Sequence, residues 1–338
     1  MTLQPIVRKI KKNKKNILKI LAVIVAVAGM LVILYVADAP EPGSSTAAQE
    51  EDEDRQITYF NGKAYRFKDN VQTVLLIGID KYLEEINIPE DTNLNTQQAD
   101  FVVLLIIDNS TRSYKMLQIN RDTMVPVREL GLNGEVLQTV TEQLALSHTY
   151  GNGGKESCRN TVKSVESLLF GIDIEHYVAF TMDAIPIIND EAGGVTVLIE
   201  DDFSAVDPEL VKGQEITLKG DQSLEYIRAR GQMSDPTNIA RMGRHRTYMN
   251  ALLTAALAKM EANSTWGAKT VGEVWEYLTT DLLTGGISDM ADILAKYERG
   301  EILTIEGETK TTDFVEFYPN EDALKKQVIE LFFEPVSE

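Results

Sequence analysis

Acidic and basic side chains stand at the ends of several apolar runs in this chain. Asp80 closes one run, Asp100 opens the next, and Arg121 and Asp122 follow a third. Arginine forks match phosphate oxygens, and Mg²⁺ takes one or two carboxylates together with phosphate oxygens. If these ends meet in space, they form a site for a phosphate-bearing substrate and a hard cation.

Four further arginines lie later in the chain. Arg228 and Arg230 end one predicted helix, and Arg241 and Arg244 lie three residues apart in the next, which places them on one helix face. Each feature also has an ordinary interpretation. An aspartate at a strand end is typical of a cap or a turn, and an arginine at a helix end is favoured by the helix dipole. The chemistry therefore depends on the convergence of these residues.

The elements that must position these residues follow from the hydrophobic pattern. Apolar runs predict strands at 71–80, 101–108 and 113–120, and a short turn between the last two predicts an antiparallel hairpin. Further strands are expected at 176–180, 195–199 and 312–319, and helices at 134–150, 157–170, 182–192, 221–230 and 240–260. This mixture predicts an α/β fold in which a mixed central sheet is flanked by helices.

The composition excludes several classes of protein. The chain has 33 Lys and Arg residues against 52 Asp and Glu residues, with three histidines and one cysteine. Residues 1–36 hold seven of the basic residues and no acidic one, so the rest of the chain is strongly acidic. Such a body argues against nucleic-acid binding, which depends on many lysine and arginine contacts. The cysteine and histidine counts exclude a disulfide framework and a zinc module.

The N-terminal region has the pattern of a membrane anchor. Residues 17–36 are apolar except for Lys19, and a helix of this length spans about 30 Å, the thickness of the bilayer core. The positive-inside rule then places residues 1–16 in the cytoplasm and the body outside it. A signal peptide cleaved after the small residues at 37–39 is the alternative. Residues 37–56 are Pro/Ser-rich and then acidic, which predicts a flexible stalk.

The folded body is expected at 57–262, followed by a C-terminal extension at 263–338 for which the sequence predicts no role. Over about residues 71–254 the chain resembles the LytR-CpsA-Psr family of bacterial envelope enzymes. The segments that carry the resemblance are VLLIGID (74–80), QQADFVVLLIID (97–108), NRDTMVPV (120–127), LALSHTYGNGG (144–154), TMDAIPIINDEAGGVTVLI (181–199), LKGDQSLEYIRAR (218–230) and NIARMGRHRTYM (238–249).

The resemblance implies a single-pass protein of the cell membrane with an extracytoplasmic catalytic domain of α-β-α layers. Such an enzyme would move a polyprenyl-pyrophosphate-linked glycopolymer onto peptidoglycan and release polyprenyl phosphate. Its lipid would lie in an apolar pocket between the sheet and the helices, with the pyrophosphate at an arginine-lined mouth. The implied partners are the lipid-linked glycan, peptidoglycan and membrane lipid, but no nucleic acid.

The resemblance also assigns roles to individual residues. Asp80 and Asp100 would hold Mg²⁺ or Mn²⁺. Asp122 would orient Arg121 or help to deprotonate the attacking hydroxyl, which makes these two residues the catalytic candidates. The pyrophosphate would be bound by Arg121, Arg228, Arg230, Arg241 and Arg244. Phosphoryl transfer needs mainly positioning and charge neutralisation, so no protein nucleophile is required.

The chain departs from the family pattern at five positions. Tyr82 and Gln98 stand where arginines are usual, Asn238 replaces an aspartate, His245 a glutamine and Ala145 a lysine. Fewer cations could lower the affinity for pyrophosphate. The alternative function is therefore a sensor or scaffold of the envelope that binds polyprenyl phosphate without turnover. A transcriptional role is disfavoured, because the body is predicted to lie across the membrane from DNA.

Three further features are interpreted as structural. Cys158 reads as an inert core thiol, and the glycine-rich segment 151–157 does not match the phosphate-loop pattern. His148 follows Ser147 with no aspartate nearby in the chain, so a structural role is favoured over a hydrolytic triad. His245, on the arginine-bearing helix, is the better candidate for the site.

Overall fold

The computed structural model describes residues 57–81, 93–263, 265–282 and 296–336. The predicted cytoplasmic tail, membrane helix and stalk, at 1–16, 17–36 and 37–56, lie outside the described residues, as does Tyr82. Within the described ranges, no helix combines the length and the apolar character needed to cross a bilayer.

A mixed six-stranded sheet forms the centre of the described residues, with the strand order β11-β8-β3-β4-β5-β12. Its strands are β3 (Val71–Lys81), β4 (Gln97–Asp108), β5 (Ser113–Ile119), β8 (His176–Thr181), β11 (Leu278–Thr280) and β12 (Glu298–Thr304). Strand β4 is antiparallel to both β3 and β5, which confirms the predicted hairpin, whereas β8 and β12 are parallel to β3 and β5.

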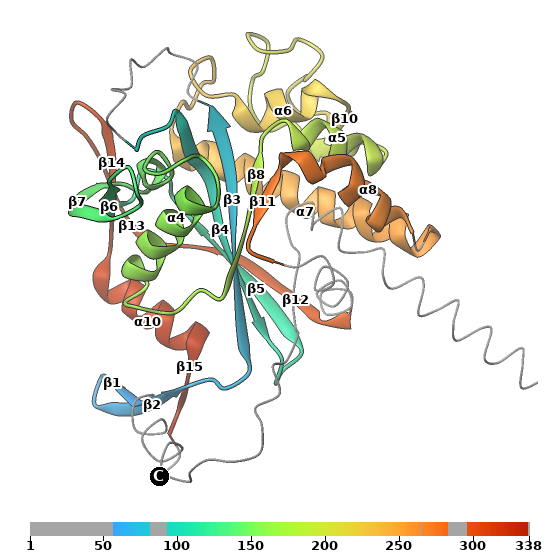
Figure 1. Ribbon diagram of the computed structural model, residues 1–338. Coiled ribbons are helices and arrows are strands. Elements are labelled where there is room, and N and C mark those ends of the chain that lie inside the picture. The colour runs from blue at the N-terminus through green and yellow to red at the C-terminus, as the bar shows by residue number, and fades with distance from the viewer. Residues whose placement is uncertain (1–56, 82–92, 264, 283–295, 337–338) are drawn as a thin grey trace, which may run out of the picture.

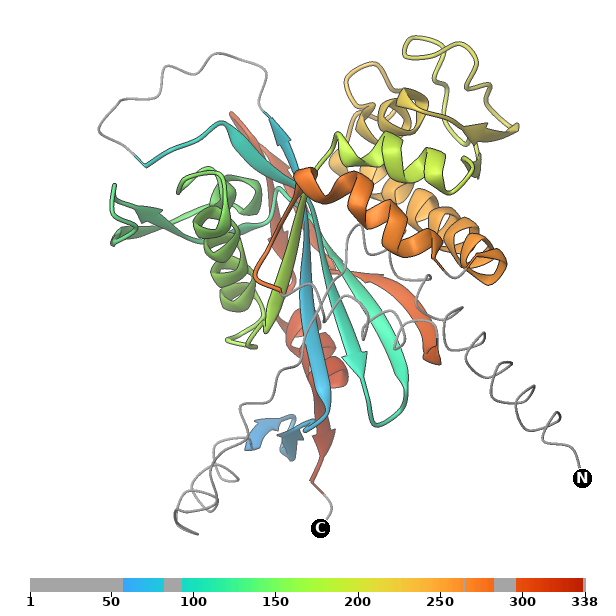
Figure 2. The same cartoon turned by 45° about the vertical axis from the view of Figure 1, so that its right-hand side comes forward.

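Helices cover both faces of this sheet. They are α4 (Lys155–Leu168), α5 (Ala184–Glu191), α6 (Asp221–Arg228), α7 (Asn238–Ala262), α8 (Trp266–Val274) and α10 (Glu321–Phe332), with 3-10 helices η2 (Leu144–His148) and η3 (Trp275–Tyr277). Helices α4 and α10 lie on one side, and α5, α6, α7 and α8 on the other (Figures 1 and 2). The fold is therefore the three-layered α-β-α arrangement that the sequence predicts.

The two faces of β4 explain its long apolar run. Val103 and Leu105 belong to the core under α5, α6 and α7, whereas Val102 and Leu104 belong to the core under α4 and α10. Successive side chains of a strand point to opposite faces, so a strand covered on both sides is apolar at every position. Such a run is also easy to recognise in a sequence.

Smaller sheets surround this core. Their strands are β1 (Ile57–Phe60), β2 (Lys63–Phe67) and β15 (Phe333–Pro335), β6 (Met124–Leu130) and β7 (Val136–Gln143), β9 (Val195–Leu198) and β10 (Glu215–Leu218), and β13 (Gly307–Thr311) and β14 (Val315–Pro319). Strand β14 confirms the prediction at 312–319.

The prediction of a helix at 134–150 is wrong. The segment instead forms strand β7, which pairs antiparallel with β6, and then the short 3-10 helix η2. Its apolar residues are spaced as in a helix, but the β7 part is rich in β-branched Val and Thr and largely exposed. Pairing with a neighbouring strand satisfies such a backbone better than an isolated helix does.

The region after residue 262 belongs to the same body. Strands β11 and β12 form the two edges of the central sheet, and α10 packs against its second core. The sequence predicted mainly helices here. Edge strands such as β12 are half exposed, so their apolar pattern is weak.

Candidate active site

A β-bulge places Asp100 at the end of the central sheet. Ile79 of β3 pairs with Ala99, but Gly78 pairs with Phe101, which leaves Asp100 as an extra residue on β4. A bulge of this kind bends the strand and redirects a side chain. Ala99 and Phe101 accordingly enter opposite cores. The sequence shows the aspartate, but only the pairing of β3 with β4 shows where it points.

Two arginines from separate elements meet on Asp100. Nη1 of Arg121, in the loop after β5, donates to Oδ1 of Asp100, and Nη1 of Arg241, in the first turn of α7, donates to Oδ2 over 3.4 Å. The Arg121 side chain is 15% exposed and that of Arg241 only 8%. These two predicted residues therefore converge in a largely desolvated position.

A second ion pair lies on the neighbouring strand. Nη2 of Arg228, the last residue of α6, donates to Oδ1 of Asp80 over 2.8 Å. Asp80 pairs in register with Gln98, two residues before Asp100. The structure thus brings the carboxylates of Asp80 and Asp100 to the same end of adjacent strands, each with its own arginine.

The cations of this cluster influence one another. Burial is the main cause that lowers the pKa of Arg121 and the pKa of Arg241, the latter to about 10, and the positive charge of Arg230 lowers both further. The Nε of Arg230 itself donates to the carbonyl of Pro236 over 3.1 Å. An anion placed among these groups would relieve their mutual repulsion, so the cluster is suited to a polyanionic group such as pyrophosphate.

The other predicted arginine has different partners. Arg244 donates to Oδ2 of Asp201 over 3.2 Å and to the carbonyl of Ala229, and its guanidinium lies over the ring of Phe203. Arg241 and Arg244 therefore do not share a partner in this structure, although they share a helix. Arg244 holds the end of α6 against α7, and its contact with a substrate stays a prediction.

A pair of asparagines holds the two arginine-bearing segments together. Oδ1 of Asn120 accepts from the backbone N–H of Asp122 over 2.9 Å and from Nδ2 of Asn238 over 2.6 Å. Oδ1 of Asn238 in turn accepts from Nε and Nη2 of Arg241 over 3.1 and 2.7 Å. Asn120 is not among the site residues predicted from the sequence. The signal was an Asn followed two residues later by Asp, which is typical of a side-chain-capped turn.

Asp122 carries an unused oxygen at the centre of the site. The residue is 1% exposed, and its Oδ1 accepts from Nε of Arg121 over 3.2 Å. Its Oδ2 is buried and has no hydrogen-bond partner among the described residues. Buried acceptors without a partner are rare, so this oxygen has the capacity to accept a hydrogen bond from a hydroxyl that enters the site.

The donor set for a cation is small. Among the described residues no group of three or more His, Cys, Asp and Glu side chains could hold a metal ion. Asp80 and Asp100 alone supply two carboxylates with hard oxygen donors. This set fits Mg²⁺ or Mn²⁺ if phosphate oxygens of a substrate complete the coordination, which is the usual pattern for Mg²⁺.

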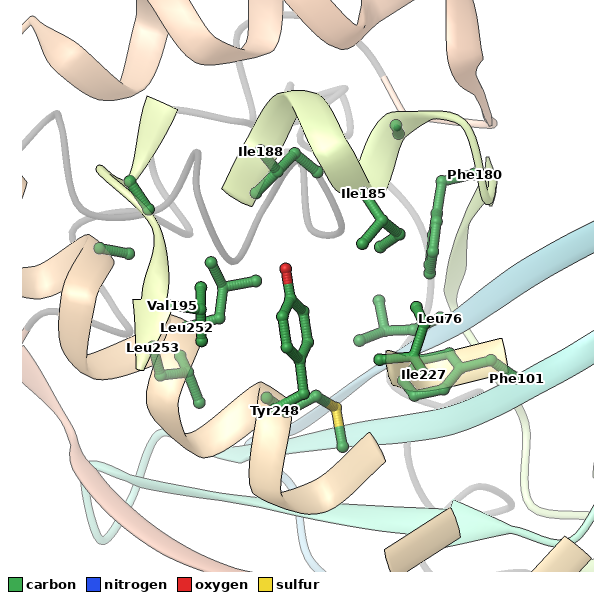
Figure 3. Packing of buried hydrophobic residues seen from close by; sticks show 14 of the residues in the cluster. Leu76, Phe101, Phe180, Ile185, Ile188, Val195, Ile227, Tyr248, Leu252 and Leu253 are labelled. Atoms are coloured by element: carbon green, nitrogen blue, oxygen red, sulfur yellow. The ribbon is translucent and has the colours of Figure 1, made fainter. Parts of the chain in front are cut away.

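An apolar pocket lies next to the ion pairs, between the sheet and helices α5, α6 and α7. Its lining residues are Phe101, Phe180, Met182, Ile185, Ile227, His245, Tyr248 and Met249. The cavity measures only about 20 Å³, because these side chains pack closely. Figure 3 shows Tyr248 extending from α7 toward α5, where its hydroxyl donates to Oδ1 of Asn189 over 3.2 Å.

His245 belongs to this pocket. Its Nε2 donates to the carbonyl of Ile227 over 3.0 Å, and its ring meets Phe101 edge to face. Burial, with the neighbouring charge of Arg241, lowers its pKa to about 3, so the ring is neutral. His148 and Cys158 are fully buried in the other core, and burial raises the pKa of Cys158 to about 12. These observations support the structural interpretation of both residues.

Comparison with known proteins identifies the family. The family model described as the LytR_cpsA_psr family matches residues 35–331. The chain belongs to this family. Its α-β-α fold is also found in solved structures such as TagT bound to LIIa-WTA. That structure superimposes with a TM-score of 0.57 and is 22% identical in sequence, and the match covers 78% of this chain and 90% of that chain.

Two relatives of this chain are named by their activity. TagU of Oceanobacillus iheyensis is 28% identical over 305 residues, or 86% of this chain and 84% of the relative. TagV of Bacillus subtilis is 29% identical over 187 residues, or 54% of this chain and 42% of the relative. Both are named polyisoprenyl-teichoic acid–peptidoglycan teichoic acid transferases.

The structure gives a physical account of one departure from the family pattern. At the position where an aspartate is usual, Asn238 uses its carbonyl oxygen to hold Arg241 and its amide to reach Asn120. A carboxylate could hold the arginine but could not donate to Asn120. At another departure, Ala145 is fully buried in η2, where its backbone N–H donates to the carbonyl of Arg121 over 2.9 Å.

Proposed function

We propose that this protein is a membrane-anchored phosphotransferase that moves a polyprenyl-pyrophosphate-linked glycopolymer onto peptidoglycan and releases polyprenyl phosphate. The observation that carries the proposal is the meeting of Arg121 and Arg241 on Asp100, beside the pair of Arg228 with Asp80. The relatives TagU and TagV are named as transferases of teichoic acid to peptidoglycan, which supports the same reaction class.

The arginines bind the pyrophosphate in this proposal. Arg121 and Arg241 contact the phosphate that is attacked, while Arg228 and Arg230 bind from the end of α6 and the loop after it. Arg244 assists by holding that loop in place. Guanidinium groups neutralise the charge that builds up on phosphate oxygens, and a preorganised, largely buried cluster does so with little reorganisation.

Asp122 acts as the general base. Its free Oδ2 accepts the proton of the acceptor hydroxyl, the 6-hydroxyl of a muramic acid residue, while Oδ1 stays on Arg121. The hydroxyl oxygen forms a bond to the glycan-bearing phosphorus as the bond from that phosphorus to the bridging oxygen breaks. Polyprenyl phosphate leaves with that bridging oxygen, and the glycopolymer phosphate becomes an ester of peptidoglycan.

Asp80 and Asp100 would hold Mg²⁺ or Mn²⁺ in the loaded enzyme. When bound there, the cation supplies positive charge that neutralises phosphate oxygens. Arg121, Arg228 and Arg241 contact the two carboxylates in this structure, so they would stand beside phosphates bound there.

The apolar pocket receives the polyprenyl chain. Its volume of about 20 Å³ holds roughly one water molecule, so the chain enters only if α5, α6 and α7 move away from the sheet. The proposed membrane helix at 17–36 keeps the domain at the outer surface of the cell membrane, where such a lipid is presented.

A transfer assay tests the proposal. Full-length protein in detergent is mixed with a labelled polyprenyl-pyrophosphoryl glycan, Mg²⁺ and peptidoglycan, and the release of polyprenyl phosphate is measured. The proposal predicts label in peptidoglycan and an equal amount of free polyprenyl phosphate. Tight binding of the lipid without any turnover would instead support the sensor or scaffold, in line with the loss of an arginine at Gln98.

A further inference from the structure

A groove begins beside Asn120, in the loop that carries Arg121 and Asp122. The donor does not occupy this groove in the proposed reaction. Its first part has a volume of about 610 Å³ and lies between the first turns of α7 and the chain that connects β12 to α10. The lining residues that matter here are Asn120, Ile239, Arg246, Glu306, Glu308 and Phe317.

The groove continues along α7. A second cavity of about 670 Å³ is lined by Gly243, Arg246 and Asn250 of α7 and by residues of β12. Ile239, Gly243, Arg246 and Asn250 are spaced by three or four residues, so they form one stripe along the helix. Arg246 belongs to both cavities and is held by Oε1 of Gln118 over 2.8 Å. The stripe is about 17 Å long, which suits an extended chain rather than a single small molecule.

Hydrogen bonds join the groove to the residues proposed for catalysis. Asn120, which lines its first part, accepts from the backbone N–H of Asp122. The backbone N–H of Phe317, in the opposite wall, donates to the carbonyl of Asp122 over 2.8 Å, and Thr123 forms a β-bridge with Phe317. A molecule in the groove therefore contacts Asn120, the residue before Arg121 and Asp122 in the same loop.

The lining favours one of the two substrates. Amide and carboxylate groups stand beside apolar surface such as Ile239, which is 54% exposed, and the ring of Tyr318, which is 39% exposed. Sugar rings have polar hydroxyl edges and apolar C–H faces, so they match such a lining. The two cavities are lined by four carboxylates against two guanidiniums, and this negative balance would repel a polyanionic glycopolymer. The charged residues are Glu200, Glu301, Glu306 and Glu308, and Arg246 and Arg299.

We propose that this groove binds the acceptor, a glycan strand of peptidoglycan, beside the loop that carries Asp122. The inference rests on the proposed function, because it assigns the second substrate of the same reaction. It also gives the C-terminal region a role, since residues between β12 and α10 form one wall of the groove.

Ile239→Trp tests the groove by filling it. Leu257→Trp is the matched control, because Leu257 is an exposed apolar residue of α7, 41% accessible, that does not line either cavity. If the groove binds the acceptor, Ile239→Trp in the full-length protein should raise the KM for peptidoglycan fragments at least tenfold, whereas Leu257→Trp should not. The Kd for a prenyl pyrophosphate should stay within twofold of the wild-type value in both variants. An unchanged KM in Ile239→Trp would overturn the assignment.

A binding measurement separates this inference from the proposed reaction. The Ile239 methyl resonance of the wild-type protein is followed during titration with a muramic-acid-containing tetrasaccharide, without donor. A saturable shift supports the groove even if no transfer is ever observed, in which case only the proposed reaction fails. No shift at millimolar tetrasaccharide, in a protein that does transfer the polymer, would overturn the groove and leave the reaction standing.

Discussion

The side-chain amide of Asn238 donates to Oδ1 of Asn120 over 2.6 Å, and this contact links α7 to the loop after β5. Arg241 is held by the same Asn238, and Arg121 follows Asn120 directly in the chain. The two arginines that meet on Asp100 are thus positioned by two neutral side chains rather than by an additional carboxylate.

Asn238→Asp should destabilise the fold by about 1–3 kcal/mol, because a carboxylate oxygen would face Oδ1 of Asn120 with no proton between them. Urea unfolding measures the change. Asn152→Asp is the matched control, since Oδ1 of Asn152 accepts only from Gly154 and a carboxylate can do the same. Equal stability of the two variants would show that the link between the asparagines contributes nothing.

Arg121→Ala should lower kcat/KM for polyprenyl phosphate release by about 10²–10³, the usual cost of removing one donor that stabilises charge in the transition state. Arg121→Lys should recover only part of this loss, because an ammonium lacks the fork that contacts both Asp100 and Asp122. Arg128→Ala serves as the control, since Arg128 donates to Asn160 on the other side of the sheet. Comparable losses at Arg121 and Arg128 would indicate a purely structural role.

Stability should fall as the pH is lowered from about 6.5, and His245 should be one cause. Burial lowers the pKa of His245 to about 3 in the folded protein, whereas an unfolded histidine titrates near 6.5. Between these values only the unfolded state binds the proton, so each pH unit removes about 1.4 kcal/mol per such group.

His245→Gln should flatten this dependence, because a glutamine amide can donate to the carbonyl of Ile227 and does not titrate. His148, whose pKa is lowered to about 4 by burial, should account for a second part of the slope. Urea unfolding at a series of pH values measures both effects. If the free energy of unfolding depended on pH as steeply in His245→Gln as in the wild-type protein, this explanation would be wrong. His245 would then bind its proton as readily in the folded state as in the unfolded state.

Removal of divalent cations should abolish turnover, and Mg²⁺ or Mn²⁺ should restore it. Asp80→Asn should raise the Mg²⁺ concentration needed for half-maximal activity, because one of the two proposed carboxylate ligands is lost. The release of polyprenyl phosphate in chelator and in a Mg²⁺ titration checks this. Full activity in chelator would mean that the arginines neutralise the phosphates without a cation.

Some of this structure follows directly from the sequence. Strands at 71–80 and 101–108 could be predicted because both faces are buried and the apolar run is continuous. The bulge at Asp100 could not, because it depends on the partner strand. At Gly78 an added Cβ would lie 2.8 Å from Cβ of Phe101, so the two strands approach closely there.

Other features depend on pairing that a single segment does not reveal. The segment 136–143 has helical spacing but becomes β7 because β6 lies beside it. Asn238 could be recognised as an unusual residue, but its partner Asn120 lies far away in the chain. The sequence shows which elements carry the arginines. It does not show that Arg244 turns away from Arg241 and pairs with Asp201.

Calorimetric titration with geranylgeranyl pyrophosphate of the wild-type protein, Arg121→Ala, Arg241→Ala and the double variant tests the central claim most directly. If both guanidiniums grip one headgroup, each single change should weaken binding at least tenfold. The double change should then differ from the sum of the single losses by about 0.5–3 kcal/mol. Wild-type affinity in both single variants would contradict the account, because the arginine cluster would then not be the pyrophosphate site.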